Sequence, residues 1–221
     1  MIAKMPEVMT EIVLASGSPR RRELLGKLGV KFRVRAADID EDIPERDPAR
    51  MVAELARQKA RAVALLEPGN VILAADTTVA LDGAILNKPV SVLENAEFIA
   101  RLSGRWHEVF TGMCFNTPIE SGGGEFVAVE RTRVKFRDLS KLEIEGYAQS
   151  GEGLDKAGGY GIQERGMALV EAIEGDFFNV VGLPMARLVL LAREAGLELL
   201  DWAAPVSVPV SSPVSSRGGG A

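Results

Sequence analysis

The sequence has very little cysteine, histidine or continuous apolar stretch, and each shortage excludes a class of protein. Cys114 is the single cysteine, so no disulfide forms within the chain, and we expect a small buried hydrophobe there. His107 is the single histidine, which excludes zinc sites built from several histidines and leaves a Ser-His-Asp triad one candidate base. No apolar run reaches the roughly 18 residues that span a bilayer. Residues 1–10 lack the apolar stretch of a secretory signal, so we expect a cytoplasmic protein.

Positive charge is also in short supply. The chain has 26 lysines and arginines against 31 aspartates and glutamates, a net charge of −5. A nucleic-acid polymer needs a basic surface that displaces counterions, so the balance argues against such a partner. A small anionic substrate remains possible, because a few local cations decide its binding.

Helix-like and strand-like patterns alternate along the chain. Strands are predicted at residues 11–15, 32–36, 71–75, 78–81, 84–86, 106–116, 125–136, 167–173 and 177–180. Helices are predicted at residues 20–28, 48–66, 91–102, 140–149 and 184–195. Asp82-Gly83 favours a tight hairpin turn between two of the strands. Helices between strands, with hairpins interrupting the crossovers, indicate an α/β fold with a mixed sheet and flanking helices.

Composition sets the expected boundaries. Residues 1–10 form an N-terminal extension and residues 11–204 a single domain. Residues 205–221 consist of Pro, Val, Ser and Gly with almost no charge, which predicts a disordered tail. The valines leave open a short additional strand.

A phosphate-binding turn is suggested by Ser16-Gly17-Ser18-Pro19-Arg20-Arg21, between a predicted strand and a predicted helix. Free backbone N–H groups at a helix N-terminus bind phosphate, and Arg20 can add a bidentate grip. The segment is not a Walker loop, because it lacks the Gly-Lys-Ser/Thr ending. A capped helix with a solvated basic turn is the alternative.

Acidic and basic residues farther along suggest metal and phosphate chemistry. Residues 38–42 hold four carboxylates, and Mg²⁺ takes one or two carboxylates together with substrate phosphates. Asp76 ends a predicted strand, where ligands of α/β sheets gather, and can hold a metal or orient a water. Lys59 and Lys88 can neutralise phosphate charge. A solvated acidic loop and surface lysines are the alternatives.

A glycine-rich loop covers residues 155–163. Three glycines in four residues, with one aromatic among them, suggest a loop that folds closely over a ligand. Gln163 offers both a donor and an acceptor, as reading a base edge requires. Simple loop flexibility would explain the glycines equally well.

Together these segments resemble the Maf family of nucleotide pyrophosphatases. The matching segments are residues 14–21, 54–60, 75–77, 87–89, 102–105, 154–163 and 179–184. They appear in family order and extend over about residues 11–200. The resemblance implies an elongated structure with two lobes around a central nucleotide cleft, and commonly a homodimer.

The resemblance also assigns roles. It implies hydrolysis of a nucleoside triphosphate between the α and β phosphates with a divalent cation, Mg²⁺ or Mn²⁺. Asp76 would be the catalytic acidic residue, a carboxylate that accepts the proton of the attacking water and helps to hold the metal. Glu41 (or Asp40) would be the second metal-side carboxylate. The positions that match phosphate contacts are Ser16, Arg20, Lys59 and Lys88.

Three positions separate branches of the family. Arg20, Thr77 and Gln163 resemble the branch that acts on dTTP and UTP, whereas the branch that prefers 7-methyl-GTP typically replaces that arginine and glutamine. Alternatives are a pyrophosphatase for modified nucleotides and a nucleotide-binding regulator of cell division with little turnover. Asp76, Lys59 and Lys88 are all intact, which favours the enzyme.

Overall fold

The computed structural model describes residues 12–118 and 123–200. The predicted N-terminal extension and the predicted tail lie outside these residues. None of the helices in the described part is long and apolar enough to cross a membrane.

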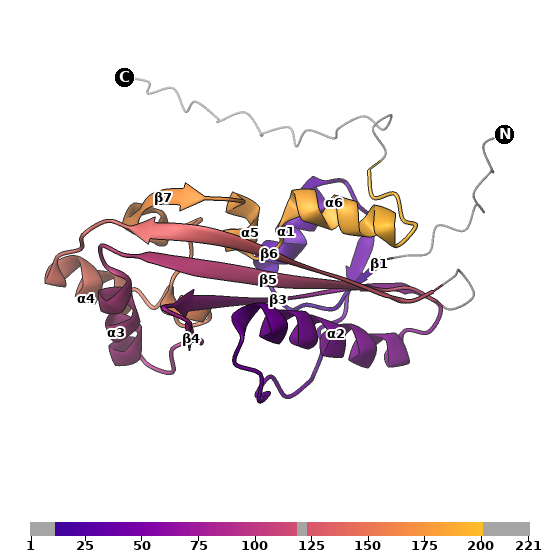
Figure 1. Cartoon of the computed structure of the whole chain (residues 1–221), viewed down its shortest axis with the longest axis horizontal. Helices are drawn as coiled ribbons and strands as arrows, with labels where there is room; N and C mark the ends of the chain where they lie inside the picture. Colours follow the sequence, from indigo (N-terminus) through magenta and orange to yellow (C-terminus); the bar gives the residue numbers. More distant parts are fainter. Residues whose placement is uncertain (1–11, 119–122, 201–221) are drawn as a thin grey trace, which may run out of the picture.

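A mixed sheet of seven strands runs through the molecule in the order β2-β1-β3-β5-β6-β7, with β4 paired to β3. The strands are β1 (Ile12–Leu14), β2 (Phe32–Val34), β3 (Val71–Leu81), β4 (Ala84–Leu86), β5 (Trp106–Asn116), β6 (Glu125–Phe136) and β7 (Val170–Glu174). Strand β1 is parallel to β2 and β3, and every other pairing is antiparallel. The long strands β3, β5 and β6 give the molecule its elongated shape (Figure 1). The predicted α/β class and mixed sheet are confirmed.

In the described residues, six α-helices flank this sheet. They are α1 (Pro19–Lys27), α2 (Pro48–Leu66), α3 (Val92–Leu102), α4 (Lys141–Gln149), α5 (Phe177–Val181) and α6 (Met185–Glu194). Side-chain caps begin several of them: Ser18 accepts from the backbone N–H of Arg21, and Ser140 forms a capping box with Glu143. Two 3₁₀ turns, η2 (Ala157–Gly159) and η3 (Arg165–Leu169), shape the chain before β7.

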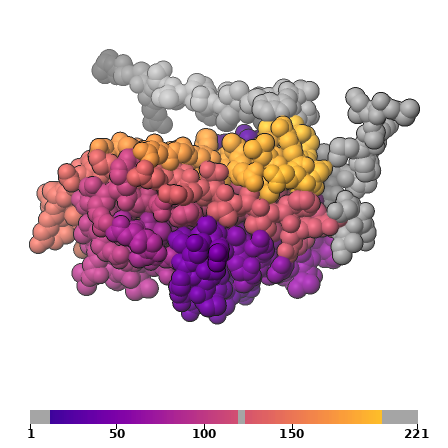
Figure 2. All heavy atoms as spheres, in the orientation of Figure 1, coloured from indigo at the N-terminus to yellow at the C-terminus, as the bar shows by residue number. Residues whose placement is uncertain are grey.

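The sheet buries side chains on both faces. On one face α2 packs Ala56, Ala60 and Val63 against the strands, and α6 lies on the opposite side of the body (Figures 1 and 2). Cys114 belongs to the α2 side and is fully buried, as expected. Burial raises the pKa of its thiol to about 12, so it is not a nucleophile.

Strand β3 is longer than predicted. The sequence pattern ended it at Asp76, but it continues to Leu81 because β5 pairs with it from Ile72 to Ala80. Asp76 therefore lies in the middle of a strand and not at its end. Backbone pairing with β5 holds the polar residues in extended form although they break the apolar pattern.

Two predicted strands near the C-terminal end are partly wrong. Only the second half of residues 167–173 is a strand, since η3 extends to Leu169. Residues 177–180 belong to the helix α5, whose N-cap, Asp176, accepts from the N–H of Phe178. Gly182 ends that helix with a φ of 115°, a left-handed conformation that glycine adopts without strain. These caps outweigh the strand preference of the Phe and Val residues.

Helix α2 lies very close to β5 at Gly112. A Cβ atom on Gly112 would lie 2.3 Å from the carbonyl oxygen of Val52. We expect Gly112→Ala to lower the free energy of unfolding by roughly 1–3 kcal/mol, because it overpacks this contact. Gly146→Ala is the control: its Cβ would meet nothing within 4 Å, and alanine in a helix is neutral or stabilising. Urea unfolding of both variants measures this effect. Equal free energies of unfolding in Gly112→Ala and Gly146→Ala would contradict the predicted overpacking.

Candidate active site

One edge of β3 is left without a strand partner at its centre. Strand β1 pairs with β3 only as far as Leu73, and β4 pairs with it only from Val79. Between these points no other strand in the described ranges covers this edge. A cavity of about 790 Å³ opens there. Ligands of α/β sheets bind where neighbouring strands part in this way.

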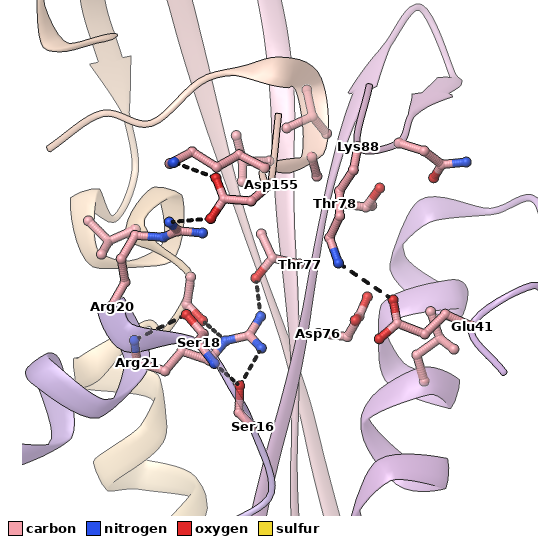
Figure 3. A pocket seen from close by; sticks show the side chains of 18 of the residues that line it. Ser16, Ser18, Arg20, Arg21, Glu41, Asp76, Thr77, Thr78, Lys88 and Asp155 are labelled. Atoms are coloured by element: carbon pink, nitrogen blue, oxygen red, sulfur yellow. Dashed lines mark hydrogen bonds and ion pairs between the residues drawn. The ribbon is translucent and has the colours of Figure 1, made fainter. Parts of the chain in front are cut away.

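All the predicted site residues line this one cavity, although they come from separate segments of the chain. They are Ser16, Arg20, Glu41, Lys59, Asp76, Thr77, Lys88 and Gln163. Alternate residues of a strand point to opposite faces, so Asp76 faces α2 while Thr77 faces α1 (Figure 3). The cavity thus extends around the unpaired edge and reaches both faces of the sheet.

On the α2 face, Lys59 lies between two carboxylates. Its Nζ is 2.6 Å from Oδ1 of Asp76 and 2.6 Å from Oε1 of Glu41. Nζ of Lys88 is 3.8 Å from Oε2 of Glu41, the ion pair drawn in Figure 3. Lys59 and Asp76 are each only 8% exposed, and such buried charges persist only when they are paired.

Glu41 and not Asp40 contributes to the cavity lining. The Asp40 carboxylate instead accepts from the backbone N–H of Asp42. Partial burial opposes ionisation of Glu41, but the hydrogen bond and charge of Lys59, with the charge of Lys88, outweigh it and lower the pKa of this carboxyl.

On the α1 face, the central residue is Arg21, which the sequence did not single out. Its Nε donates to the carbonyl oxygen of Gly182 at 2.8 Å, and Nη1 donates to Oγ of Ser16 at 3.1 Å. Nη1 also donates to the carbonyl oxygen of Ala75 and Nη2 to Oγ1 of Thr77, both at 2.8 Å. The guanidinium thereby satisfies a β3 carbonyl that has no strand partner.

Adjacent arginines have different roles because consecutive residues of a helix point in different directions. Arg21 turns toward the sheet. Arg20 turns toward the glycine-rich loop, where its Nη1 lies 3.7 Å from Oδ2 of Asp155. That carboxylate also accepts from Nζ of Lys156 at 2.6 Å, and these two cations lower its pKa against the opposing effect of burial.

The glycine-rich loop packs closely against β3. Gly158 and Gly159 have φ angles of 70° and 75°, and a Cβ on Gly158 would lie 2.7 Å from Val79. Larger residues would push the loop away from the strand. Gln163, the last residue of the loop, is half-buried and lines the cavity.

A metal ion fits this site only with help from a ligand. Within residues 12–118 and 123–200, no three acidic, histidine or cysteine side chains gather as a metal site. Two carboxylates, Asp76 and Glu41, nevertheless converge on one point, the Nζ of Lys59. Mg²⁺ commonly takes one or two carboxylates and completes its shell with substrate phosphates and water. The pair therefore suits a cation that arrives with a polyphosphate.

Comparison with known proteins agrees with this geometry. Residues 11–195 match the family described as Maf-like protein. The chain belongs to the Maf family. It is 53% identical over 191 residues to a dTTP/UTP pyrophosphatase of Deinococcus radiodurans, covering 86% of this chain and 96% of that protein. It is 50% identical over 196 residues to one of Myxococcus xanthus, covering 88% of this chain and 97% of that one.

Among solved structures, this Maf protein is similar to the Ham1 protein of Staphylococcus aureus, with a TM-score of 0.44 and 16% identity. The match covers 58% of this chain and 72% of that one. This likeness is too slight to add to the family assignment.

His107 lies in the core and forms no catalytic triad. Its Nε2 is 2.8 Å from the Tyr160 hydroxyl, its ring packs edge-on against Phe136, and it is 2% exposed. Burial lowers its pKa to about 4, so the folded protein favours the neutral imidazole. The triad that the sequence left open is thereby excluded.

The depressed His107 pKa predicts acid sensitivity. The unfolded chain binds a proton near pH 6.5 and the folded protein only near pH 4, so stability is complete above pH 6.5 and falls as the pH drops through this window. The total loss is about 3 kcal/mol. Urea unfolding from pH 7 to 4.5 should show a smaller decline in His107→Gln, which retains a neutral polar group beside Tyr160. Equal declines in the free energy of unfolding in wild type and His107→Gln would show that His107 is not the acid-sensitive group. Loss of turnover in this variant at neutral pH would contradict its purely structural role.

Proposed function

We propose that this Maf protein hydrolyses dTTP and UTP between the α and β phosphates and releases a nucleoside monophosphate and pyrophosphate. The observation that carries the proposal is the group of Asp76, Lys59 and Glu41 at the unpaired edge of β3. The printed activity of the relatives, dTTP/UTP pyrophosphatase, supports the same conclusion. A cavity of about 790 Å³ is large enough for a nucleotide.

Asp76 is the proposed proton acceptor. Its Oδ1 accepts from Lys59, and Oδ2 accepts from no protein donor in the described part of the chain. Oδ2 is therefore the oxygen that can take the proton of a water attacking the α phosphate. The ammonium of Lys59 keeps this carboxylate oriented.

The remaining charges fit a polyphosphate. Lys59 and Lys88 would stabilise the negative charge that develops on the leaving pyrophosphate. Ser16 and Arg20 lie at the N-terminal end of α1, where free N–H groups favour phosphate. A divalent cation, Mg²⁺ or Mn²⁺, bound with the triphosphate would be held by Asp76 and Glu41 and would neutralise phosphate charge.

A regulator with little turnover is the weaker candidate. Binding alone does not need a buried carboxylate with one oxygen left free, and burying charge is costly. By the family resemblance we propose a cytoplasmic homodimer, with residues 11–204 as its domain. Sedimentation at equilibrium tests the dimer.

The products test the reaction. With UTP and Mg²⁺ or Mn²⁺ we expect UMP and pyrophosphate, and chelation should abolish the rate. Asp76→Asn removes the proton acceptor while keeping the shape, so kcat should fall by at least about 10²-fold. Asp40→Asn is the matched control, since this nearby acid lies outside the cavity lining. Orthophosphate and UDP as products would refute the reaction, and near-normal turnover in a folded Asp76→Asn protein would refute the assigned base.

Base selectivity tests Gln163. Its amide can accept from N3–H and donate to a carbonyl of uracil or thymine, whereas cytosine reverses both groups. An unpaired buried group costs about 1–3 kcal/mol, which predicts a clear preference for dTTP and UTP over CTP. Gln163→Glu removes the donor and should lower kcat/KM for UTP. Comparing UTP, CTP, GTP and 7-methyl-GTP in both proteins decides the matter: an unchanged ranking, or 7-methyl-GTP as the best wild-type substrate, would overturn the pyrimidine assignment.

A further inference from the structure

A chain of hydrogen bonds leads from Arg21 across two strands to α5. Nη2 of Arg21 donates to Oγ1 of Thr77, which lies 2.9 Å from Oγ1 of Thr111 on β5. The Thr111 hydroxyl in turn lies 3.2 Å from the carbonyl oxygen of Asn179. A carbonyl can only accept, so Thr111 donates its single proton there. Thr77 must therefore be the donor to Thr111.

This direction leaves the Thr77 hydroxyl with no proton for a ligand. The hydroxyl donates its proton to Oγ1 of Thr111, and its oxygen accepts from Nη2 of Arg21. The family resemblance placed Thr77 near the nucleobase as a specificity residue. The hydrogen bonds instead pair Thr77 with Arg21 and Thr111. Thr77 can therefore influence the substrate through the Arg21 guanidinium that it holds in place.

The guanidinium is almost fully committed to the protein. Four of its five N–H groups donate to neutral oxygens, those of Gly182, Ser16, Ala75 and Thr77. No carboxylate of the described residues lies within ion-pair distance of it. Arg21 lines the cavity and all four of its hydrogen-bond acceptors are neutral, while the charges of Asp76 and Glu41 act on it from beyond ion-pair distance. An anion would therefore find one N–H and a positive charge that has no ion-pair partner among the described residues.

We propose that Thr77 and Thr111 are positioning residues that fix Arg21 so that its remaining N–H binds a phosphate oxygen of the substrate. The proposal rests on the proposed function insofar as the ligand is a triphosphate. Both ends of the network are anchored near α5: Asn179 ends the threonine chain and Gly182 accepts from Nε. The buried amide of Asn179 also donates to the carbonyl oxygen of Val109 on β5, which fixes this anchor to the sheet.

Binding of inorganic triphosphate, measured by calorimetry, tests the proposal without turnover. Thr111→Val and Thr77→Val keep the shape but remove the hydroxyl, so each should weaken binding roughly five- to thirtyfold, the effect of one misplaced charged hydrogen bond. Thr111→Ser and Thr77→Ser should bind like wild type. Thr78→Val is the matched control: Thr78 is 1% exposed, follows Thr77 on the opposite face of β3, and its hydroxyl has no partner.

Kinetics with UTP separate positioning from general damage. KM should rise in Thr111→Val and Thr77→Val while kcat changes by less than about twofold, because Asp76 and Lys59 lie on the other face of β3. A lower melting temperature with unchanged triphosphate affinity in Thr111→Val would show a purely structural role and overturn the proposal. If Thr111→Val does not fold, Thr77→Val decides by the same measurement.

Two further outcomes are informative. Unchanged triphosphate affinity in Thr77→Val, combined with a lost preference for UTP over CTP, would show direct base contact and refute positioning. A wild-type protein that releases no pyrophosphate from UTP or dTTP would refute the proposed function alone, because the triphosphate affinities still test the network.

Discussion

The unpaired stretch of β3 between Leu73 and Val79 is the constraint on which the site depends. A buried strand edge carries N–H and C=O groups that need partners, and here no strand in the described part of the chain supplies them. Arg21 satisfies part of that need by donating to the carbonyl oxygen of Ala75. The rest of the edge is open to the cavity. The same gap in pairing therefore creates the pocket and requires a charged side chain beside it.

The protein places two cations on opposite faces of β3 and surrounds them differently. Lys59 lies between two carboxylates, so its charge is neutralised and its partners are held in place. Arg21 donates to neutral acceptors and has no ion-pair partner among the described residues, so its charge remains available to an anion; burial lowers its pKa, and the more distant charges of Asp76 and Glu41 oppose that shift. The first arrangement suits orienting a carboxylate for proton transfer. The second suits holding a polyphosphate.

The glycines of the chain serve close approach around this pocket. Gly112 lets α2 lie against β5, which brings Lys59 to Asp76 from one face. Gly158 brings the glycine-rich loop against β3, and Asp155 of that loop reaches Arg20. Gly182, with a φ of 115°, ends α5 where its carbonyl oxygen accepts from Arg21. The close contacts that these glycines permit thus set the positions of the cavity walls.

Local pattern by itself determined most of the elements, the mixed α/β class and, through the family resemblance, the eight predicted residues that the cavity brings together. It failed where tertiary contacts or caps override local preference: β5 carries β3 through Asp76, and Asp176 turns residues 177–180 into a helix. The family resemblance gave a role to Arg20 alone, and only the tertiary structure showed that Arg21 is the arginine that faces the sheet, since its partners lie far along the chain. Which arginine faces the sheet depends on the rotation of α1 against β3 and α5, and no sequence spacing encodes that rotation.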